Sequence, residues 1–484
     1  MRRKTKIIAT LGPSVDSAGA IADVIEAGLN VARLNFSHGT WEEHTRRFEV
    51  VRKVADDLGK PVAIMQDIQG PKIRVGTFPG GSVTLETGSE VLLIAGAGEG
   101  TETEIPIAYL DGVNLSPGAE IMFADGLITL DAIDVDQGRI RARVERGGQL
   151  LDHKGAAFPG SPISIPIVTS KDEADLEFGM SLGFDLIAVS FVGSGHDIRT
   201  VRGIVGDTPV IAKIESAVGY ANLDDILTEA DGAMVARGDL GIELSLQSVP
   251  RAQSEILRKT NAAGKISITA TEMLESMTTN RRPTRAEVTD VYRSVLEGTD
   301  AVMLSAETAI GEYPARAVEA MGIICREAEG SEDYGRAADV SNLASQARFA
   351  SATAQASVDT ADRLGLKTIV AFTETGSTAR LLSKYRPHSD VFAFTRNEST
   401  YRLMAIYGAI TPLLYSGFES TDEMIAFAEQ FLLAEDLAVA GEGIVMIAGA
   451  PPNLRASTNL MKLHEVGSVA GGLPGGRRRP ASAD

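Results

Sequence analysis

The sequence is poor in cysteine, tryptophan and aromatic residues in general. Its 484 residues include one cysteine and one tryptophan, and aromatic residues make up 5% of the chain. The single Cys325 excludes an intramolecular disulfide, and its helical spacing among apolar neighbours predicts a thiol that only fills the core. A hydrophobic content of 44% is enough to build such a core in several domains.

Positive charge is also scarce. The chain has 46 lysine and arginine residues against 65 aspartate and glutamate residues, which gives a formal net charge of −19 at pH 7. Because a nucleic acid backbone needs a basic stripe, this composition argues against DNA or RNA as a partner. An acidic protein that acts on an anionic substrate has to gather its basic side chains in one site.

Long hydrophobic runs are absent as well. No apolar stretch approaches the roughly 18 to 20 residues that cross a membrane. The amino-terminal "MRRKTKIIATLG" is basic and then apolar over too few residues for a secretory signal. We therefore expect a cytoplasmic protein that does not bind a membrane.

Short apolar strands alternate with amphipathic helical stretches along most of the chain. Three such pairs precede residue 71, and five more lie between residues 166 and 334. Eight pairs with about 235 residues in total are typical of a (β/α)8 TIM barrel, which we expect residues 1–70 and 166–334 to form. Residues 71–165 run from "KIRVGTF" to "ISIPIV" as strands with glycine turns, which predicts an all-β insert after the third barrel strand.

A second α/β region follows the barrel. Within residues 335–472, helical patterns alternate with the apolar runs "KTIVAFT", "VFAFT", "TPLLY" and "GIVMIAG". This pattern predicts a separate, doubly wound C-terminal α/β domain. Residues 473–484 are rich in glycine, proline and arginine without periodicity, and predict a disordered tail.

Polar residues stand at the carboxyl ends of seven of the eight predicted barrel strands. A single charged strand end often only reaches solvent, but the carboxyl ends of a TIM barrel meet on one face, so this set predicts an active site. In strand order the residues are Arg33, Asn35 and Ser37; Asp67; Ser190; Lys213 and Glu215; Arg237, Gly238 and Asp239; Thr271 and Glu272; Ser305 and Glu307.

The strand "VIAKIES", residues 210–216, carries two charges on one face, Lys213 and Glu215. Glu215 and Asp239 lie on neighbouring strands and are two carboxylates of the kind that Mg²⁺ uses, and that Mn²⁺ accepts as well. No histidine or cysteine lies near either carboxylate in the sequence, which argues against zinc. Lys213 and Arg33 add two cations, so we expect a phosphorylated substrate whose charge lies between Lys213 and Glu215.

The segment "ARGDLGIE", residues 236–243, predicts an anion site. Gly238 allows a tight turn, and the residues after it can open a short helix whose free N–H groups bind a carboxylate or phosphate. Thr271 can donate a hydrogen bond to the same anion. His38, in "NFSHG", is interpreted as a loop or capping residue and not as the general base.

Taken together, these segments resemble the pyruvate kinase family over nearly the whole chain. The resemblance runs from "TKIIATLGP" to "STNLMKLHEVG" through "NVARLNFSHG", "DIQGPKIR", "IAKIES", "MVARGDLGIE", "TATEMLESM", "RPTRAEVTDV" and "LSAETAIGEYP". It implies transfer of the phosphoryl group of phosphoenolpyruvate to ADP, giving pyruvate and ATP in the last step of glycolysis. It also implies a homotetramer, and an insert that acts as a mobile lid and excludes water.

The resemblance implies a role for each of the following residues. Lys213, Thr271 and Arg33 would be catalytic, and Arg33, Ser190, Lys213, Gly238, Asp239 and Thr271 would contact the substrate. Glu215 and Asp239 would bind Mg²⁺, and Asn35, Phe36, Ser37, His38, Arg74 and Lys154 would meet the nucleotide. For protonation of the enolpyruvate it suggests a relay through Thr271 and Ser305, without settling which group delivers the proton.

One departure from the family concerns K⁺. Many members hold K⁺ near the positions of Asn35, Ser37, Asp67 and Ile68 and have a glutamate at the position of Lys72. An ammonium group at that site could supply the charge of K⁺, so we predict little or no K⁺ requirement.

The C-terminal region contains "FTETGSTARLLSKYRP", a strand, a polar loop and a helix. Such a loop suits a phosphate at a helix start, and in the family it binds a phosphorylated allosteric effector. The alternative is an ordinary βα turn with N-cap residues. The candidate effector residues are Thr373, Thr375, Gly376, Ser377 and Thr378.

Two other functions would also use a polar site at the ends of the barrel strands. A Mg²⁺-dependent barrel lyase or aldolase acting on a 2-oxo acid would use Glu215 and Asp239. Such an enzyme binds no nucleotide, so it would not need the insert, Arg74 or Lys154 as a lid. A non-catalytic metabolite sensor would be expected to lose Lys213 or a metal carboxylate, and the chain retains them.

Overall fold

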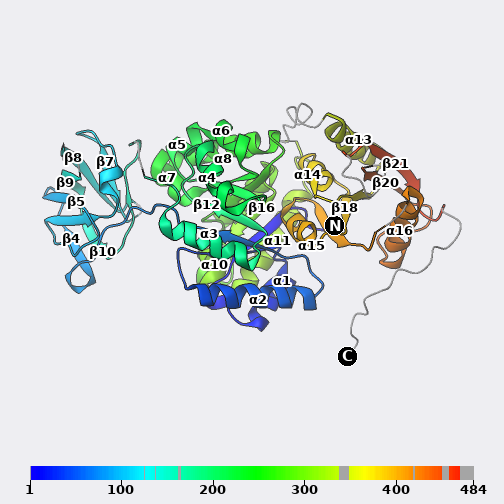
Figure 1. Cartoon of the computed structure of the whole chain (residues 1–484), viewed down its shortest axis with the longest axis horizontal. Helices are drawn as coiled ribbons and strands as arrows, with labels where there is room; N and C mark the ends of the chain where they lie inside the picture. The colour runs from blue at the N-terminus through cyan, green and yellow to red at the C-terminus, as the bar shows by residue number, and fades with distance from the viewer. Residues whose placement is uncertain are drawn as a thin grey trace.

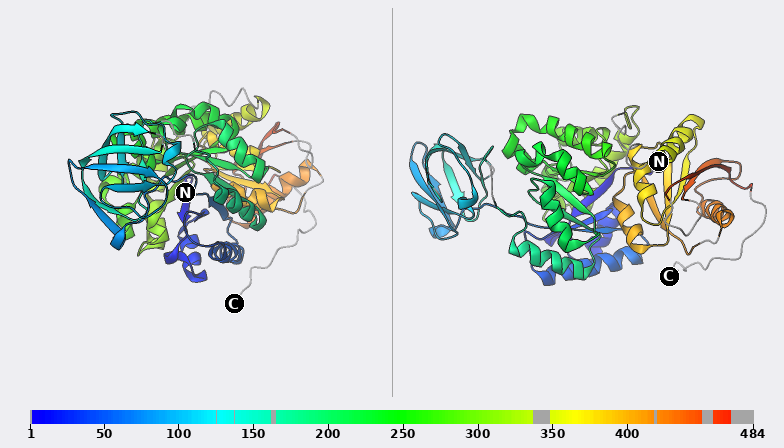
Figure 2. Two further views of the ribbon diagram at one scale, coloured as in Figure 1. Left: turned by 60° about the vertical axis from the view of Figure 1, so that its left-hand side comes forward. Right: turned by 45° about the horizontal axis from the view of Figure 1, so that its top comes forward.

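The computed structural model describes residues 2–124, 126–136, 138–161, 165–336, 348–417, 420–449 and 457–468. Figure 1 shows a β-rich part, a barrel and an α/β part in a row, with the barrel in the middle. The views in Figure 2 place the β-rich part and the α/β part at opposite ends of the barrel. The predicted tail, residues 473–484, lies outside the described residues.

The middle part is a closed barrel of eight parallel strands, which confirms the predicted fold. Neighbouring strands follow the order β1, β16, β15, β14, β13, β12, β3, β2, and β2 pairs with β1. The strands are β1 (Lys6–Thr10), β2 (Val31–Asn35), β3 (Ala63–Asp67), β12 (Leu186–Val189), β13 (Val210–Ile214), β14 (Gly232–Ala236), β15 (Ile266–Ala270) and β16 (Ala301–Leu304). Three precede the insert and five follow it, as the alternation of strands and helices predicted.

Helices surround the barrel because alternate strand residues face opposite ways. In β13, for example, Ile211 packs inside the barrel with Met65 and Met234, whereas Val210 and Ala212 pack against the helices. The helices are α1 (Ala18–Ala27), α2 (Trp41–Asp57), α3 (Ser170–Leu182), α4 (Gly195–Val205), α5 (Ala217–Ala221), α6 (Leu223–Glu229), α7 (Arg237–Leu244), α8 (Val249–Ala262), α9 (Arg285–Leu296), α10 (Ala306–Ala309) and α11 (Pro314–Glu329).

The insert is built from strands with its own buried core. Its strands are β4 (Ser82–Leu85), β5 (Glu90–Ala95), β6 (Glu104–Ile107), β7 (Glu120–Phe123), β8 (Ile128–Asp136), β9 (Arg139–Arg146), β10 (Gly148–Leu151) and β11 (Ala156–Ala157). Six of them form one sheet in the order β11, β7, β8, β9, β5, β6, and β10 pairs with β4. The strict alternation of buried and exposed residues in β9 keeps one face of that sheet in the core.

The insert also differs from the prediction in one predicted strand and in three strands that were not predicted. "KIRVGTF" was expected to be a strand, but residues 72–78 make only isolated bridges, because Arg74, Val75 and Thr77 each pair with a different segment. The sequence pattern also missed three short strands: β6 and β10, which are four residues each, and β11, which is two residues long. Residues 163 and 164, the first two of "ISIPIV", lie outside the described residues, and the boundaries drawn at residues 71, 166 and 335 stay predictions.

In the described residues of the α/β part, one sheet has five strands in the order β19, β18, β17, β20, β21. They are β17 (Thr368–Phe372), β18 (Asp390–Thr395), β19 (Ile410–Leu414), β20 (Gly443–Ala448) and β21 (Leu460–Glu465). The first four were predicted, and β21 is an additional antiparallel edge strand beside β20. The helices are α13 (Arg348–Leu364), α14 (Ser377–Lys384), α15 (Glu398–Leu403) and α16 (Thr421–Ala434), with α13 and α14 covering one face of the sheet and α16 the other.

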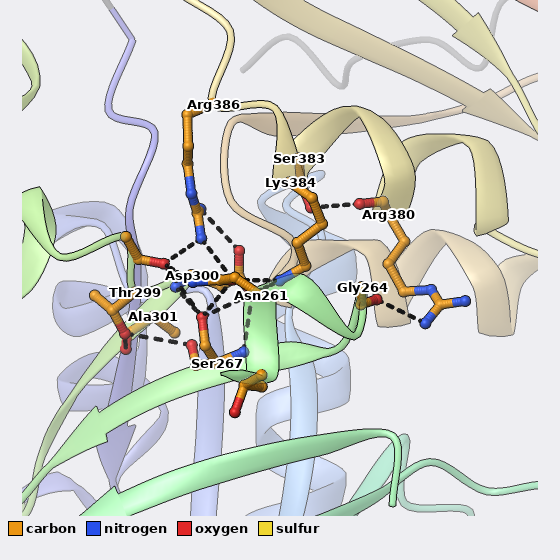
Figure 3. A network of polar contacts seen from close by, with 12 residues as sticks. Asn261, Gly264, Ser267, Thr299, Asp300, Ala301, Arg380, Ser383, Lys384 and Arg386 are labelled. Carbon is orange, nitrogen blue, oxygen red and sulfur yellow. Dashed lines mark hydrogen bonds and ion pairs between the residues drawn. The ribbon is translucent and has the colours of Figure 1, made fainter. Parts of the chain in front are cut away.

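A buried cluster of charges joins the α/β part to the barrel (Figure 3). Asp300 stands just before β16, at the amino-terminal end of the barrel, and accepts hydrogen bonds from Lys384 and from Arg386, the latter at 2.8 Å. Both cations also reach Asn261 Oδ1, at 3.1 Å each. Burial alone would raise the pKa of Asp300, but the charges of Lys384 and Arg386 hold it below its ordinary value. The α/β part therefore docks on the end of the barrel opposite the predicted active site.

Within the described residues, no helix is long and apolar enough to cross a membrane.

Candidate active site

Lys213 lies at the centre of the polar residues that end the barrel strands. It points inward, like Ile211 two residues before it, and its side chain is 10% exposed. Its ammonium group contacts three oxygens: Ser190 Oγ at 2.6 Å, Glu215 Oε1 at 3.0 Å and Asp67 Oδ1 at 3.2 Å. Burial alone would lower the pKa of Lys213, but the charges of Asp67 and Glu215 raise it above its ordinary value. The side chain is therefore a fixed positive charge.

Arg33 is the second cation of the site, and it is held as firmly. Its Nε donates to Asp67 Oδ2 at 2.6 Å, and its Nη1 donates to Thr10 Oγ1 at 2.8 Å. Burial would raise the pKa of Asp67, but Arg33 and Lys213 outweigh burial and lower it. Asp67 thus spaces the two cations. Thr10 was not predicted as a site residue, although it ends the strand next to β2 and could have been found on that ground.

Glu215 and Asp239 are the candidate metal ligands. Glu215 is buried, and its Oε2 accepts a hydrogen bond from Phe191 N at 2.7 Å. Burial, together with the charge of Asp239, raises the pKa of Glu215 despite the opposing effect of Lys213. Asp239 is exposed and lines a cavity. The two carboxylates therefore lie close enough to interact.

This donor set fits Mg²⁺ better than a metal held by protein groups alone. No group of three or more histidine, cysteine, aspartate or glutamate side chains in the described part of the chain is arranged to hold a metal ion. Mg²⁺ is usually bound through one or two carboxylates, with waters and substrate phosphates as the other ligands.

Thr271 and the start of α7 form the third element of the site. The helix begins at Arg237, immediately after β14, so Gly238 lies in its first turn and not before it as predicted, and Asp239 follows in the same turn. Gly238 N donates to Thr271 Oγ1 at 2.9 Å, and Thr271 Oγ1 donates to Ala270 O at 2.6 Å. Thr271 has φ of 68°, a conformation that a β-branched residue rarely adopts and that is typical of functional sites.

Two charged residues were predicted at the mouth of the barrel, the face where the carboxyl ends of its strands meet. Their side chains contact neighbouring loops and not the centre of the site. Arg237 Nη2 donates to Thr271 O at 2.6 Å, and Arg237 Nη1 pairs with Asp290 at 2.5 Å. Glu307 accepts hydrogen bonds from Ser305 N at 2.7 Å and Leu274 N at 3.1 Å. Both side chains therefore hold the loops after β15 and β16 in place.

Ser305 keeps its hydroxyl available. Ser305 Oγ is buried and makes no hydrogen bond within the described part of the chain. It follows β16 directly, at the same end of the barrel as Thr271, which follows β15, and these two strands are paired. A buried hydroxyl without a partner is costly, so such a group calls for a ligand or a water.

A cavity of about 590 Å³ lies between the insert and the barrel. Lys72, Arg74 and Lys154 line it from the insert and the segment that leads into it, and Asp239 and Glu243 line it from the barrel. Three predicted residues, Arg74, Lys154 and Asp239, are thus brought together. Glu243 was not predicted, because it stands within α7 and not at a strand end.

Several predicted residues do not line this cavity: Arg33, Asn35, Phe36, Ser37, His38, Lys213, Glu215 and Thr271. Phe36 even faces the core, where its ring stacks on His44 with 4.0 Å between ring centroids. His38 is exposed. The protein beside the ring removes part of its hydration, and this effect, together with the positive charges of Lys72 and Arg74, lowers the pKa of His38. The loop that carries His38 therefore lies close to the basic residues of the cavity.

The predicted monovalent-cation site is occupied by internal contacts. The carboxylate of Asp67 is shared by Arg33 and Lys213, and Ile68 O accepts a hydrogen bond from Ser190 Oγ at 2.8 Å. Burial and the charge of Lys213 lower the pKa of Lys72, against the opposing charges of Asp239 and Glu215. In the part of the chain that the structure describes, no hydrogen bond or ion pair joins Lys72 to the predicted K⁺ ligands.

The candidate effector loop is partly turned inward. Thr373 and Thr378 are buried, and Thr378 Oγ1 lies 2.7 Å from Thr458 Oγ1. Thr375 and Ser377 are exposed, and Thr375 Oγ1 donates to Ser377 Oγ at 3.2 Å. Gly376, with φ of 80°, precedes α14, where only a residue without a Cβ adopts this conformation freely.

The prediction also overlooked an acidic residue in this loop. Glu374 lies between Thr373 and Thr375, and its carboxylate pairs with Arg396 at 3.0 Å.

Known proteins share this architecture and sequence. Residues 2–318 match the family described as pyruvate kinase, barrel domain, and residues 351–464 match that described as pyruvate kinase, alpha/beta domain. Pyruvate kinases of Staphylococcus aureus and Staphylococcus epidermidis are 41% and 40% identical to the chain over 483 residues, covering 98% of it and 83% of each relative. The crystal structure of a pyruvate kinase from Cryptosporidium parvum superposes with a TM-score of 0.90 at 34% identity, over 96% of both chains. The chain belongs to the pyruvate kinase family.

Proposed function

We propose that the mouth of the barrel transfers the phosphoryl group of phosphoenolpyruvate to ADP. The bond between phosphorus and the enol oxygen breaks, and a bond between phosphorus and a terminal oxygen of ADP forms. The enolate left behind takes up a proton at its methylene carbon and becomes pyruvate. The observation that carries the proposal is the buried ammonium of Lys213, held in place by three oxygens.

Lys213 and Arg33 would bind the negative charge of the substrate. Both are fixed by Asp67, so little reorganisation is needed when charge moves from the enol oxygen to the transferring group. Ser190, which accepts a hydrogen bond from Lys213 and donates one to Ile68 O, orients the ammonium.

Glu215 and Asp239 would hold Mg²⁺. When bound, Mg²⁺ neutralises charge on phosphoryl oxygens. Phe191 N donates to Glu215 Oε2 and so orients the carboxylate. Glu215 Oε1, which contacts Lys213, then remains the oxygen that could bind the metal. Mn²⁺ would be accepted by the same oxygen ligands.

Gly238, Asp239 and Thr271 would contact the carboxylate end of the substrate. The first turn of α7 contributes backbone N–H groups, and Gly238 N already donates to Thr271 Oγ1. Thr271 and the unpartnered hydroxyl of Ser305 are the candidates for relaying the proton to the enolate.

Asn35, Ser37, His38, Arg74 and Lys154 would meet ADP. Arg74 and Lys154 line the cavity next to Asp239, and closure of the insert toward the barrel would bring these cations to the phosphates. Such closure would also keep water from competing with ADP for the phosphoryl group. Phe36 would contribute by fixing the start of this loop, because its ring is in the core, its N–H donates to Asp67 O and its carbonyl accepts a hydrogen bond from Lys171.

Three further properties are part of the proposal. Lys72 would replace K⁺, so that the enzyme needs little or none. The loop containing Thr375, Gly376 and Ser377 would bind a phosphorylated effector. The protein would be a cytoplasmic homotetramer, as the family resemblance implies.

The alternatives find less support. A lyase or aldolase would leave Arg74 and Lys154 beside Asp239 without a use. A non-catalytic sensor would not need Lys213 to be held by three oxygens.

The decisive assay measures pyruvate and ATP formed from phosphoenolpyruvate, ADP and Mg²⁺. Lys213→Met should lower kcat by about a thousandfold, the usual cost of removing one preorganised charge from such a site. Lys6→Met is the matched control, because Lys6 is a buried lysine at the opposite end of the same barrel and should leave kcat unchanged. Equal rates for the wild type and Lys213→Met would refute the assignment.

A further inference from the structure

A buried carboxylate outside the mouth ties the candidate nucleotide loop to the barrel. Asp175, on α3, is 3% exposed. Its Oδ1 accepts a hydrogen bond from Trp41 Nε1 at 2.7 Å, and its Oδ2 accepts one from Lys171 Nζ at 2.6 Å. Its backbone carbonyl accepts a third from Gln66 Nε2 at 2.6 Å, which fixes Asp175 against β3. Every oxygen of this residue is therefore used.

The two donors lead to the two ends of one loop. Lys171 Nζ also donates to Phe36 O at 2.9 Å, one residue after β2 ends. Trp41 is the first residue of α2, where the loop ends. Asp175 thus holds both ends of residues 36–41, the segment that contains Ser37 and His38.

The middle of the loop is held from the same side. His44 Nε2 lies 2.9 Å from His38 O, and the His44 ring stacks on Phe36. The Trp41 ring stacks on Phe178, one turn beyond Asp175, with 4.7 Å between centroids and 5° between planes. The rings of His44 and Phe178 therefore pack against Phe36 and Trp41 of the loop, while Asp175 and Lys171 supply the polar contacts at its ends.

The contacts require a carboxylate. Asp175 receives one N–H on each oxygen, and both hydrogen bonds are charge-assisted, which makes them about twice as strong as neutral ones. An asparagine of the same shape has one oxygen and one NH₂ group, so it can accept from Trp41 or from Lys171 but not from both through separate oxygens.

We infer that Asp175 is a positioning residue for nucleotide binding, which acts by holding Phe36 and Trp41 at the two ends of the loop that carries Ser37 and His38. This inference rests on the proposed function, because that function assigns the loop to ADP. Within the described residues, no hydrogen bond or ion pair joins Asp175 to Lys213 or to the three oxygens that hold its ammonium, so its loss should affect ADP far more than phosphoenolpyruvate.

Steady-state kinetics of the full chain separate positioning from general damage. Asp175→Asn should raise KM for ADP about tenfold, and Trp41→Phe and Lys171→Met should each raise it about threefold. In all three variants kcat and KM for phosphoenolpyruvate should change less than twofold. Trp41→Phe keeps an aromatic ring over Phe178 and removes only the N–H donor. Arg293→Met is the matched control, since it removes an exposed cation from an i,i+4 pair with a carboxylate far from the loop, and should change no constant.

The chain carries a spectroscopic reporter for the same loop. Trp41 is its single tryptophan and is 45% exposed. Titration with Mg–ADP should change the tryptophan emission of the wild type, and Asp175→Asn should need about tenfold more nucleotide for half of that change. Arg293→Met should behave like the wild type.

The outcomes are distinguishable. A wild type that forms no ATP overturns the proposed function. The inference about Asp175 is overturned if the wild type is active and Asp175→Asn changes KM for ADP less than twofold. It is also overturned if Asp175→Asn raises KM for ADP and KM for phosphoenolpyruvate equally. If Asp175→Asn does not fold, Lys171→Met decides in the same way, because the Lys171 side chain is 54% exposed and its loss leaves the core intact.

Discussion

Lys213 Nζ lies 3.0 Å from Glu215 Oε1, so the two charges where β13 reaches the mouth form a direct ion pair. The sequence interpretation placed the substrate's charge between them. In the structure they touch, because each buried charge needs an opposite charge beside it and the strand geometry puts both on one face. Asp67 and Ser190 share the ammonium, so Lys213 keeps partners if Glu215 turns toward a metal.

The first prediction concerns the metal. Glu215→Gln or Asp239→Asn should raise the Mg²⁺ concentration for half-maximal activity at least tenfold, because each removes the negative charge of one proposed oxygen ligand. The measurement is ATP formation across a Mg²⁺ titration. Glu243→Gln is the control, since Glu243 lines the same cavity without being a proposed ligand, and it should shift the titration less than twofold. A similar shift in all three variants would contradict the metal assignment.

The second prediction concerns K⁺. Wild-type activity should change less than twofold when Na⁺ in the buffer is replaced by K⁺ if, as proposed, the ammonium of Lys72 supplies the charge of K⁺. Lys72→Glu should make activity depend on K⁺, with a gain of about tenfold, since it replaces a cation by a cation ligand. Lys72→Met tests the loss of charge alone. A wild type that is strongly activated by K⁺ would show that the hypothesis about Lys72 is wrong.

The third prediction concerns the junction of barrel and α/β part. Asp300→Asn should lower the free energy of unfolding by about 3–5 kcal/mol, because it leaves Lys384 and Arg386 buried without a carboxylate. Urea unfolding followed by circular dichroism measures the loss. Glu319→Gln breaks the exposed pair with Arg316 and should cost less than about 0.5 kcal/mol. Equal midpoints for the two variants would mean that the cluster in Figure 3 does not stabilise the junction.

The fourth prediction concerns pH. Burial, with the charge of Arg3 nearby, lowers the pKa of Lys6 to about 7, and its Nζ donates to Ile410 O at 2.6 Å. Above about pH 7 the folded protein has released this proton, whereas the unfolded chain keeps it up to the ordinary value of 10.5. The unfolded state then binds more protons, so stability rises with pH in this range.

Lys6→Met isolates that effect, since methionine cannot titrate. Between pH 7 and pH 9 the wild type should gain roughly 2 kcal/mol of unfolding free energy relative to Lys6→Met. Urea midpoints of both proteins at the two pH values provide the comparison. Parallel changes in the two proteins would show that Lys6 does not release its proton on folding.

Local patterns in the sequence were sufficient for the barrel and for most of its mouth. Alternation predicted the eight strands, and the polar strand ends predicted Arg33, Asp67, Ser190 and Lys213. The eight strands are confirmed, and the structure brings these four side chains into contact, because inward-facing residues recur every two positions and the carboxyl ends of parallel strands converge. Their roles in the reaction stay predictions. The short strand β6 and the segment 72–78 were missed or misassigned, because their pairing depends on distant segments and not on their own pattern.

The roles of individual side chains at the mouth were decided by tertiary structure. Arg237 ends a strand like Lys213, yet it turns to the carbonyl of Thr271 and to Asp290. Phe36 stands in a polar motif, yet its ring packs on His44 in the core. Sequence position shows where a residue leaves the barrel, but only packing determines which way its side chain then points.

The sequence by itself determined the architecture, the convergence of charge at one end of the barrel and the family. Only the tertiary structure decided that Lys213 and Glu215 are paired, that Asp300 receives Lys384 and Arg386, and that Asp175 holds both ends of the loop before α2. The physical reason is that periodicity encodes local conformation and the buried face of each element. The choice of partner for a buried charge depends on segments that are distant in the chain and meet only when the elements pack.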